Sequence, residues 1–416
     1  MLNVVVSAYA CFPNHGSEPE VGYRWVREMS SRYQTVTVLT SHWSYERTRN
    51  CFPPNVELVP LGQRDGHRHK DTNRILFQLY YFLWTFSCFF YVKRELSRGK
   101  KYDYALSLTF GGIHMPSALP LTGVPTGWGP IGGEVCDLRL AYGVSPKLFV
   151  RMLAMKIGVI FELLNPIWLI SFWGSKRVFV KWSGTRKMLP RSKRIAVMRE
   201  NGMATPPNRT EAVLRMQRNI MQVRAGHPSM LYAGRLKLHK GVTMLHSISM
   251  RLRDRGIEGA LDVVGSGELS QLMQETSGAE GSTAFRFCGR LDREVLMKSY
   301  SKYNMLLFPS MNDPSPHVVH EALSEGCIVL AYAESGAADI AKCAGMPVVA
   351  AVNSREKMID AFADAIVSIC DGSSSVDFAK YEEYLSNWTY SQVIQKNLDV
   401  LDFDLAGKVP SEKFEM

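Results

Sequence analysis

Short apolar segments alternate with helical segments along most of the chain, and this alternation constrains the fold more than any other feature. It is typical of a parallel sheet covered by helices, because parallel strands need a crossover connection. We expect ten strands: Asn3–Ser7, Thr35–Thr40, Val56–Pro60, Tyr104–Leu108, Pro125–Trp128, Ser229–Tyr232, Ala260–Val264, Phe285–Phe287, Met305–Phe308 and Ile328–Ala331. The sequence therefore predicts an α/β protein with two doubly wound, Rossmann-like domains that face each other across an interdomain cleft.

The length of 416 residues also favours two domains, because one hydrophobic core rarely grows that large. A linker is expected at 201–208, where Gly202, Pro206 and Pro207 interrupt the alternating pattern. We place the N-terminal domain at 1–205 and the second domain at 206–385. The C-terminal helix and tail, 386–416, are expected to cross back to the N-terminal domain.

The eight cysteines are scattered and form no C-x-x-C pair, so neither a zinc site nor a disulfide framework is predicted. A strand begins almost at Met1, where a signal peptide would place a basic region and a long apolar core. Both features favour the cytoplasm.

The net charge of +10 is unevenly distributed. Between Lys147 and Arg199 lie ten Lys or Arg residues and one acid, Glu162, interleaved with large apolar residues such as Trp168 and Trp173. We expect this stretch to meet the anionic inner face of the cell membrane. A solvated basic face is the alternative. No nucleic-acid-binding motif accompanies the charge, so no nucleic-acid partner is expected.

The run Ile75–Val92 approaches the apolar length of a membrane span. Gln78, Thr85 and Ser87 weaken that reading. Strands of one expected domain also lie on both sides of the run, and a span would separate them across a bilayer. We therefore predict a buried or interfacial helix.

The segment Leu307–Gly326 is predicted to be a buried strand, a Pro/Ser turn and the start of a helix. Asp313 and Glu321 flank the turn, eight positions apart. A helix start offers unpaired N–H groups and partial positive charge to a phosphate, and a nearby carboxylate can accept hydrogen bonds from sugar hydroxyls. This combination suits a nucleotide-sugar.

The loop Gly234–Gly241 follows the first strand of the second half and carries Arg235 and Lys240. These cations can neutralise the charge that grows on a departing diphosphate. Solvated loop charges are the alternative. The later strand end of the same sheet, which carries Asp313 and Glu321, favours the functional interpretation.

Three polar groups of the first half lie at predicted strand ends. Glu18 follows Gly16 and Ser17 in a strand-to-helix loop, and Glu134 ends the glycine-rich segment after Gly127. Either carboxylate is as well explained by a structural or surface role. For His114 a satisfied structural histidine is the stronger interpretation.

Taken together, Gly234-Arg235-Leu236 with Lys240-Gly241, then Gly265-Ser266-Gly267, Cys288-Gly289, Phe308-Pro309-Ser310, Asp313 and Glu321-Ala322-Leu323 resemble the nucleotide-sugar domain of glycosyltransferase family 4. That family consists of retaining enzymes with the two-domain GT-B fold. The first half resembles a branch of surface or exopolysaccharide-assembly enzymes, through Ser7–Gly22 and Gly129–Glu134.

The resemblance implies catalytic roles for Arg235, Lys240 and Asp313. It implies that the donor is bound by Gly16, Ser17, Gly234, Gly267, Gly289, Ser315, His317, Val318 and Glu321. In that scheme Glu321 holds the ribose and Asp313 faces the donor sugar, where the family usually has glutamate. Glu18, His114 and Glu134 would lie on the acceptor side, in the N-terminal domain. Pro316 departs from the usual glycine-rich turn and cannot donate a backbone N–H.

We therefore expect a retaining, metal-independent glycosyltransferase of the hexosyltransferase type, acting in polysaccharide biosynthesis. Its co-substrate would be a UDP- or GDP-linked sugar, with no other cofactor and no metal site. The acceptor would be a lipid-linked or oligosaccharide glycan. A nucleotide-sugar epimerase of the same fold and a non-catalytic nucleotide-sugar-binding protein are the alternatives.

Overall fold

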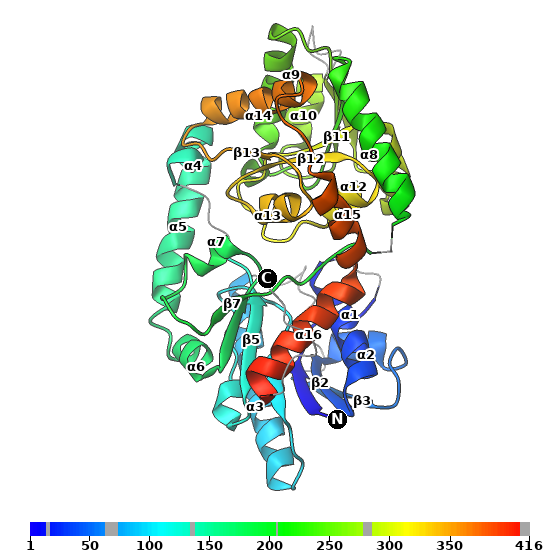
Figure 1. Ribbon diagram of the computed structural model, residues 1–416. Helices are drawn as coiled ribbons and strands as arrows, with labels where there is room; N and C mark the ends of the chain where they lie inside the picture. The colour runs from blue at the N-terminus through cyan, green and yellow to red at the C-terminus, as the bar shows by residue number, and fades with distance from the viewer. Residues whose placement is uncertain (14–16, 63–73, 134–137, 205–206, 278–284, 408–416) are drawn as a thin grey trace. The chain divides into compact units, whose positions relative to one another are not determined.

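The computed structural model describes residues 1–13, 17–62, 74–133, 138–204, 207–277 and 285–407. The chain divides into two compact units, each built around one parallel sheet (Figure 1). The predicted α/β class with two doubly wound sheets is confirmed.

The first unit contains a seven-stranded sheet in the order β3-β2-β1-β4-β5-β6-β7, with every neighbouring pair parallel. The chain leaves β1 in one direction and β4 in the other, so β1 and β4 form the switch point of the sheet. The strands are β1 Asn3–Ser7, β2 Thr35–Ser41, β3 Val56–Leu61, β4 Tyr104–Ser107, β5 Thr126–Ile131, β6 Arg177–Val180 and β7 Ile195–Val197.

Helices cover both faces of this sheet. They are α1 Ser17–Arg32, α2 His42–Thr48, α3 Arg74–Ser97, the 3-10 turn η1 Leu119–Thr122, α5 Pro146–Glu162, α6 Pro166–Gly174, α7 Ser183–Arg186 and α16 Tyr390–Ala406. Side chains alternate across the strands: Val4 and Val6 of β1 pack in the core under α1 and α16, and Val5 packs in the core under α3.

The second unit repeats the design with six parallel strands in the order β10-β9-β8-β11-β12-β13. Here β8 and β11 form the switch point. The strands are β8 Ser229–Ala233, β9 Ala260–Val264, β10 Phe285–Gly289, β11 Met305–Phe308, β12 Ile328–Tyr332 and β13 Val348–Val349. Its central strands β11 and β12 are buried throughout, and β8 is buried except at Ser229, as expected of a sheet covered on both faces.

The other helical elements are α4 Leu138–Val144, α8 Arg209–Arg224, η2 Leu238–Lys240, η3 Val242–Met244, α9 Leu245–Asp254, α10 Ser270–Ser277, α11 Arg293–Ser299, η4 Tyr300–Lys302, α12 His317–Ser324, α13 Gly336–Cys343, α14 Arg355–Cys370 and α15 Phe378–Asn387. The ten predicted strands all correspond to observed ones, with ends that differ by up to three residues.

The division into units departs from the predicted boundaries mainly at 134–156, and the other two boundaries differ by four residues each. The first unit is Met1–Gly133, Ile157–Asn201 and Tyr390–Met416, and the second is Glu134–Lys156 and Gly202–Thr389. We had placed all of 1–205 in the N-terminal domain. Leu140, Leu148 and Met152 instead lie in the core of the second unit, because α4 and the first half of α5 bury their apolar side chains there.

The apolar run that we predicted as a helix lies within α3. Among the described residues, no single helix has the length and apolar composition of a membrane span. Of the described helices, only α5 and α6 taken together, bent by 75° at their junction, reach those limits.

We had expected the basic stretch after Lys147 to form a surface, but only part of it does. It also contains β6 and β7, and Lys181 at the end of β6 is buried. We correct the prediction for this lysine, since its charge is used inside the first unit.

The C-terminal helix α16 is attached to α1 by a buried polar cluster. Asp402 pairs with Arg32 at 2.7 Å and accepts a hydrogen bond from the Tyr33 hydroxyl at 2.9 Å. Asp399 pairs with the same guanidinium at 2.6 Å. Residues at the two ends of the chain therefore complete one core.

We expect Asp402→Ala to lower the free energy of unfolding by about 2 to 3 kcal/mol, because Arg32 and Tyr33 would lose a buried partner. Asp399→Ala is the matched control and should cost less than about 1 kcal/mol, since Arg32 keeps Asp402. Urea unfolding of both variants measures the difference. Equal losses would show that Asp402 does not hold the helix.

Candidate functional site

Two loops meet at the switch point of the second sheet. One follows β8 and runs from Gly234 to Gly241, and the other follows β11 and runs from Pro309 to Pro316. The N–H of Met311 donates to the carbonyl of His239 at 3.0 Å. Gly241 has φ +72°, and a Cβ there would lie 2.3 Å from the carbonyl oxygen of Pro309. Only glycine permits this close approach.

An ion pair joins the two loops. The Nζ of Lys240 contacts the Oδ2 of Asp313, and both side chains are largely buried. The structure thus brings together two of the three residues predicted to be catalytic. Burial reduces screening by water, so this pairing fixes the position of both charged groups.

Arg235, the third predicted catalytic residue, lies in the same loop as Lys240 and is exposed. Its carbonyl accepts a hydrogen bond from the Tyr232 hydroxyl at 3.1 Å, which ties the loop to β8. Burial raises the pKa of Tyr232; the Asp313 carboxylate raises it further and the Arg235 guanidinium lowers it. Both charges therefore lie close to one buried hydroxyl.

Several cations lie near the buried side chain of His239. The pKa of His239 is lowered to about 3, first by burial and then by the charges of Lys240, Arg151, Lys237 and Arg235. Arg151 comes from α5, far away in the sequence. The imidazole is therefore neutral near pH 7 and lies among four cations. Such a concentration of positive charge suits an anion with more than one negative charge.

The same two loops and the adjoining turn η3 contain buried polar atoms that have no hydrogen-bond partner within the described structure: His239 Nδ1, Thr243 Oγ1, Ser310 Oγ and both amide atoms of Asn312. Buried polar groups are normally paired, so their concentration beside Lys240 and Asp313 is notable. Neither Arg151 nor these side chains were predicted. Only the packing of the loops brings them to one place.

The helix α12 starts beside Asp313. Its N-cap is Pro316, and no side chain caps the first turn. The predicted donor residues Ser315, His317 and Val318 surround this start. Because Pro316 carries no N–H, the helix donors begin at His317.

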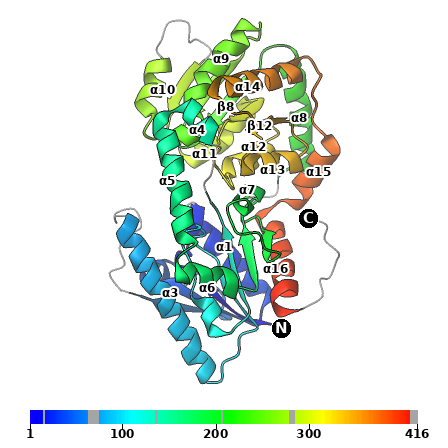
Figure 2. The same ribbon diagram turned by 90° about the vertical axis from the view of Figure 1, so that its left-hand side faces the viewer.

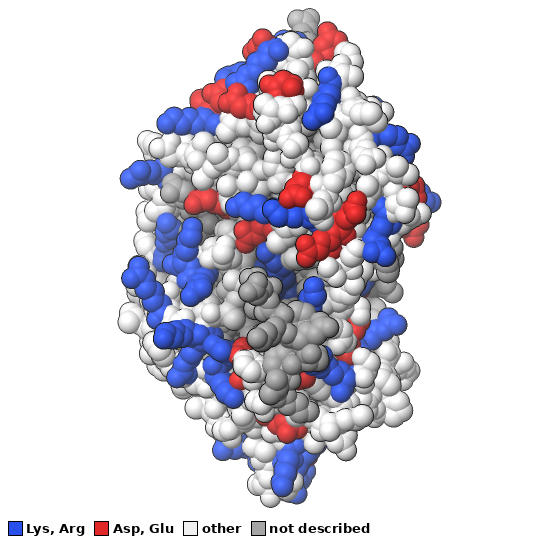
Figure 3. Space-filling view, in the orientation of Figure 1, with Lys and Arg blue, Asp and Glu red and all other residues white. Residues whose placement is uncertain are grey.

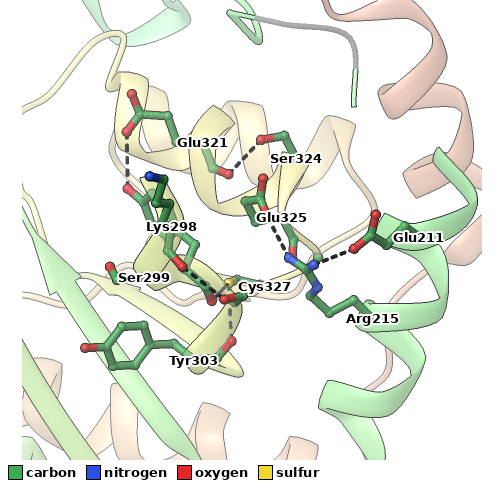
Figure 4. A network of polar contacts seen from close by, with 12 residues as sticks. Glu211, Arg215, Lys298, Ser299, Tyr303, Glu321, Ser324, Glu325 and Cys327 are labelled. Atoms are coloured by element: carbon green, nitrogen blue, oxygen red, sulfur yellow. Dashed lines mark hydrogen bonds and ion pairs between the residues drawn. The ribbon is translucent and has the colours of Figure 1, made fainter. Parts of the chain in front are cut away.

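Glu321, one turn into α12, is held from the side. Its carboxylate accepts a hydrogen bond from the buried Tyr300 hydroxyl at 3.2 Å and pairs with Arg293 at 3.2 Å. Glu325, just after the helix, pairs instead with Arg215 at 2.5 Å, and Arg215 also pairs with Glu211 at 2.8 Å (Figure 4).

The predicted donor glycines pack backbone against backbone. A Cβ on Gly265 would lie 1.8 Å from the carbonyl oxygen of Gly234, and one on Gly267 would lie 2.4 Å from that of Leu236. The carbonyl of Gly289 accepts from the N–H of Gly265 at 2.8 Å. The loops after β8, β9 and β10 therefore form one continuous backbone layer.

The switch point of the first sheet carries a second charged cluster. Glu18 accepts a hydrogen bond from the N–H of Phe110 at 3.0 Å and pairs with Lys181 at 3.1 Å. Lys181 also pairs with Glu200 at 2.8 Å. Phe110 has φ +55°, an uncommon conformation for an aromatic residue, and this hydrogen bond helps to hold it.

The remaining acceptor-side predictions have different outcomes. The Nδ1 of His114 contacts Glu162 at 3.3 Å, which fits the structural role that we favoured. Gly16 and Glu134 lie outside the described residues, and α1 begins at Ser17. Among the residues described, no three His, Cys, Asp or Glu side chains group as a metal site requires.

Comparison with known proteins gives a family match for part of the chain. Residues 216–383, less than half of its length, match the family of glycosyl transferases group 1. No curated protein sequence matches the chain. The match covers both loops that carry Lys240 and Asp313.

Several solved structures are similar over nearly the whole chain. The UDP-forming α,α-trehalose-phosphate synthase from Burkholderia vietnamiensis is 12% identical, with a TM-score of 0.57 and 96% of each chain covered. The lipopolysaccharide outer core galactosyltransferase WaaB is 13% identical, with a TM-score of 0.59 and coverage of 96% and 99%. WaaG, a glycosyltransferase involved in lipopolysaccharide biosynthesis, is 16% identical, with a TM-score of 0.51 and coverage of 97% and 100%. The predicted GT-B fold is thereby confirmed.

The low pKa of His239 has a consequence for stability. The unfolded histidine binds a proton near pH 6.5 and the folded one does not until about pH 3, so stability is lost as the pH falls between these values. When the pH falls from about 8 to about 5, we expect the free energy of unfolding of His239→Asn to decrease by about 2 kcal/mol less than that of the wild type.

His246→Asn is the matched control, because burial and Arg253 alone lower the pKa of that histidine. It should change the pH dependence less. Urea unfolding at several pH values provides the measurement. A His239 imidazole that titrates near pH 6 by NMR would contradict the described environment.

Proposed function

We propose that the protein is a glycosyltransferase that moves a hexosyl group from a UDP- or GDP-linked sugar to a glycan acceptor with retention of configuration. The observation that carries the proposal is the gathering of Lys240, Asp313 and the cations around His239 at the start of α12. The family match over residues 216–383 supports the same reaction class.

In this proposal each group has one task. As the bond between the sugar C1 and the diphosphate oxygen breaks, its electron pair goes to the diphosphate. Lys240, Arg235 and the N–H groups at the helix start stabilise that charge. Asp313, held by Lys240, faces the donor sugar, and Glu321, held by Tyr300, accepts hydrogen bonds from the ribose.

The acceptor hydroxyl oxygen forms the new bond to C1, and its proton leaves on the departing diphosphate. The Lys181 cluster offers the Glu18 carboxylate as a hydroxyl acceptor in the first unit. We propose a lipid-linked glycan of polysaccharide biosynthesis as the acceptor, and a location at the inner face of the cell membrane. The basic, aromatic stretch supports this location, and WaaG, a similar structure, acts in lipopolysaccharide biosynthesis.

The test of the reaction begins with a thermal-shift screen against UDP- and GDP-sugars, followed by transfer assays with the sugar that binds. Lys240→Gln should lower turnover by on the order of 10²-fold or more, because the leaving diphosphate loses its buried cation. Lys298→Gln, an exposed lysine on α11, is the control and should leave turnover unchanged. Near-normal turnover of Lys240→Gln would defeat the assignment.

Turnover of the donor with and without a glycan acceptor distinguishes the proposed reaction from its alternatives. An epimerase would convert the nucleotide-sugar without an acceptor. A binding protein would shift in melting temperature and turn over neither substrate. Transfer that appears only with an acceptor supports the proposal.

We also expect turnover to survive EDTA, because side-chain cations and helix N–H groups supply the charge that a divalent metal would otherwise provide. Activity is measured before and after chelation and again after Mg²⁺ or Mn²⁺ is added. Loss in EDTA followed by recovery with metal would contradict metal independence.

A further inference from the structure

The helix α5 carries an apolar stripe on its exposed side. Val150, Leu153, Ile157, Ile160 and Leu164, the last just beyond the helix, recur at alternating intervals of three and four residues and are between 36% and 71% exposed. The opposite side of the helix is already buried in the hydrophobic cores. The stripe is therefore not needed for folding of the described structure.

A second stripe lies on α3. Leu76, Leu79, Leu83 and Phe90 follow the same helical spacing and are between 39% and 64% exposed. Here too the inward side is buried, in a core that includes Trp84. A long helix that is apolar on both sides is unusual at a surface in contact with water only.

The register of the first sheet places α3 and α6 on the same face. Ala105 of β4 packs in the core under α3. Ser107, two residues later, points to the same side and is the neighbour of Trp128 in β5. The ring centroids of Trp128 and of Trp168 in α6 are 5.8 Å apart. Figure 2 looks onto this side of the unit.

The connection between β4 and β5 ties the two helices together. The Thr85 hydroxyl of α3 accepts from the N–H of Ala118 at 2.9 Å, and the Ser171 hydroxyl of α6 accepts from the N–H of Ser117 at 2.7 Å. Leu121, in η1 of this connection, is 41% exposed. With Leu169 and Trp173 of α6 it continues the exposed apolar surface. We call this side, formed by α3, η1, α6 and the end of α5, the apolar face.

Cations accompany the apolar face. Lys93 and Arg94 are exposed on α3, one turn after Phe90, and Lys156 lies on α5 beside Ile157. Arg194 donates to the carbonyl of Trp173 on α6. In Figure 3, Lys and Arg gather where Figure 1 draws α5, α6 and α7. The other side of the sheet, covered by α1 and α16, offers a single exposed large apolar residue on those helices, Phe403.

We propose that the apolar face docks onto an anionic lipid bilayer, with its stripes in the headgroup and acyl boundary and its cations at the lipid phosphates. The charges of the surface favour this occupant, because basic residues border apolar ones and the described elements of the face carry only two acids, Glu95 and Glu162. The role of this surface rests on the proposed function, because docking would bring the protein to a lipid-linked acceptor. The surface includes α3 as well as the basic stretch seen in the sequence.

The experiment places an environment-sensitive fluorophore on a cysteine at each side of the first unit. Phe90→Cys lies on the apolar face and Phe403→Cys on the opposite side, and both parent side chains are similarly exposed. The background carries Cys51→Ser and Cys343→Ser, because these two thiols are exposed. The labelled background without an added cysteine supplies the blank.

With vesicles of phosphatidylcholine and about one-third phosphatidylglycerol at low salt, we expect a blue shift and a several-fold rise in emission at position 90 and no change at position 403. High salt should weaken the response. Leu83→Gln with Phe90→Gln should lower sedimentation with these vesicles about tenfold, whereas Leu214→Gln with Met221→Gln, on α8, should not.

Four results would overturn the proposal. Two of them are no emission shift at either position and equal shifts at both. The third is a shift that needs no vesicles and grows with protein concentration, which would reveal a second copy as the occupant. The fourth is resistance to alkaline extraction, which would indicate a membrane span.

The nucleotide-sugar thermal shift is measured on the same proteins. If it persists while docking fails, only the surface assignment falls. If docking persists without any donor shift, the proposed reaction falls instead.

Discussion

The contact between Lys240 and Asp313 is the interaction on which the rest of the site depends. It joins the loop after β8 to the loop after β11, and these are the strands between which the second sheet changes direction. Because the pair is largely buried, neither charge can turn away without leaving the other unpaired. The start of α12, the cations around His239 and the carboxylate of Glu321 are positioned relative to this link.

The first unit also has a buried ion-pair cluster at its switch point, but there the excess charge is negative. At its own switch point, Lys181 is buried between Glu18 and Glu200, and Glu18 also holds the amide of Phe110. One lysine between two carboxylates leaves net negative charge, which favours hydroxyl donors. The loops of the second unit carry an excess of cations, which favours phosphate. This difference agrees with the proposal that the second unit binds the nucleotide-sugar and the first unit binds the acceptor.

The surface of the first unit is as asymmetric as its interior. Both sides of the sheet bury apolar side chains, yet α3 and α6 leave a further apolar layer exposed, whereas α1 and α16 offer charges such as Arg32, Asp399 and Asp402 to one another. Under the proposed function, an acceptor that carries a lipid would approach along that apolar side. The site and the surface therefore support one interpretation through independent observations.

The sequence by itself determined the parallel α/β architecture, the ten strands of regular pattern and the pairing of cationic and acidic loops, because local periodicity and strand-end chemistry are properties of neighbouring residues. It did not reveal β6 and β7, whose short apolar runs lie in a segment dominated by Lys and Arg, or β13, which is only two residues long. Nor could it place Arg151 beside His239, or decide that Lys181 is buried while Arg235 is exposed. Those outcomes depend on contacts between residues far apart in the chain, which only the packing of helices on sheets decides.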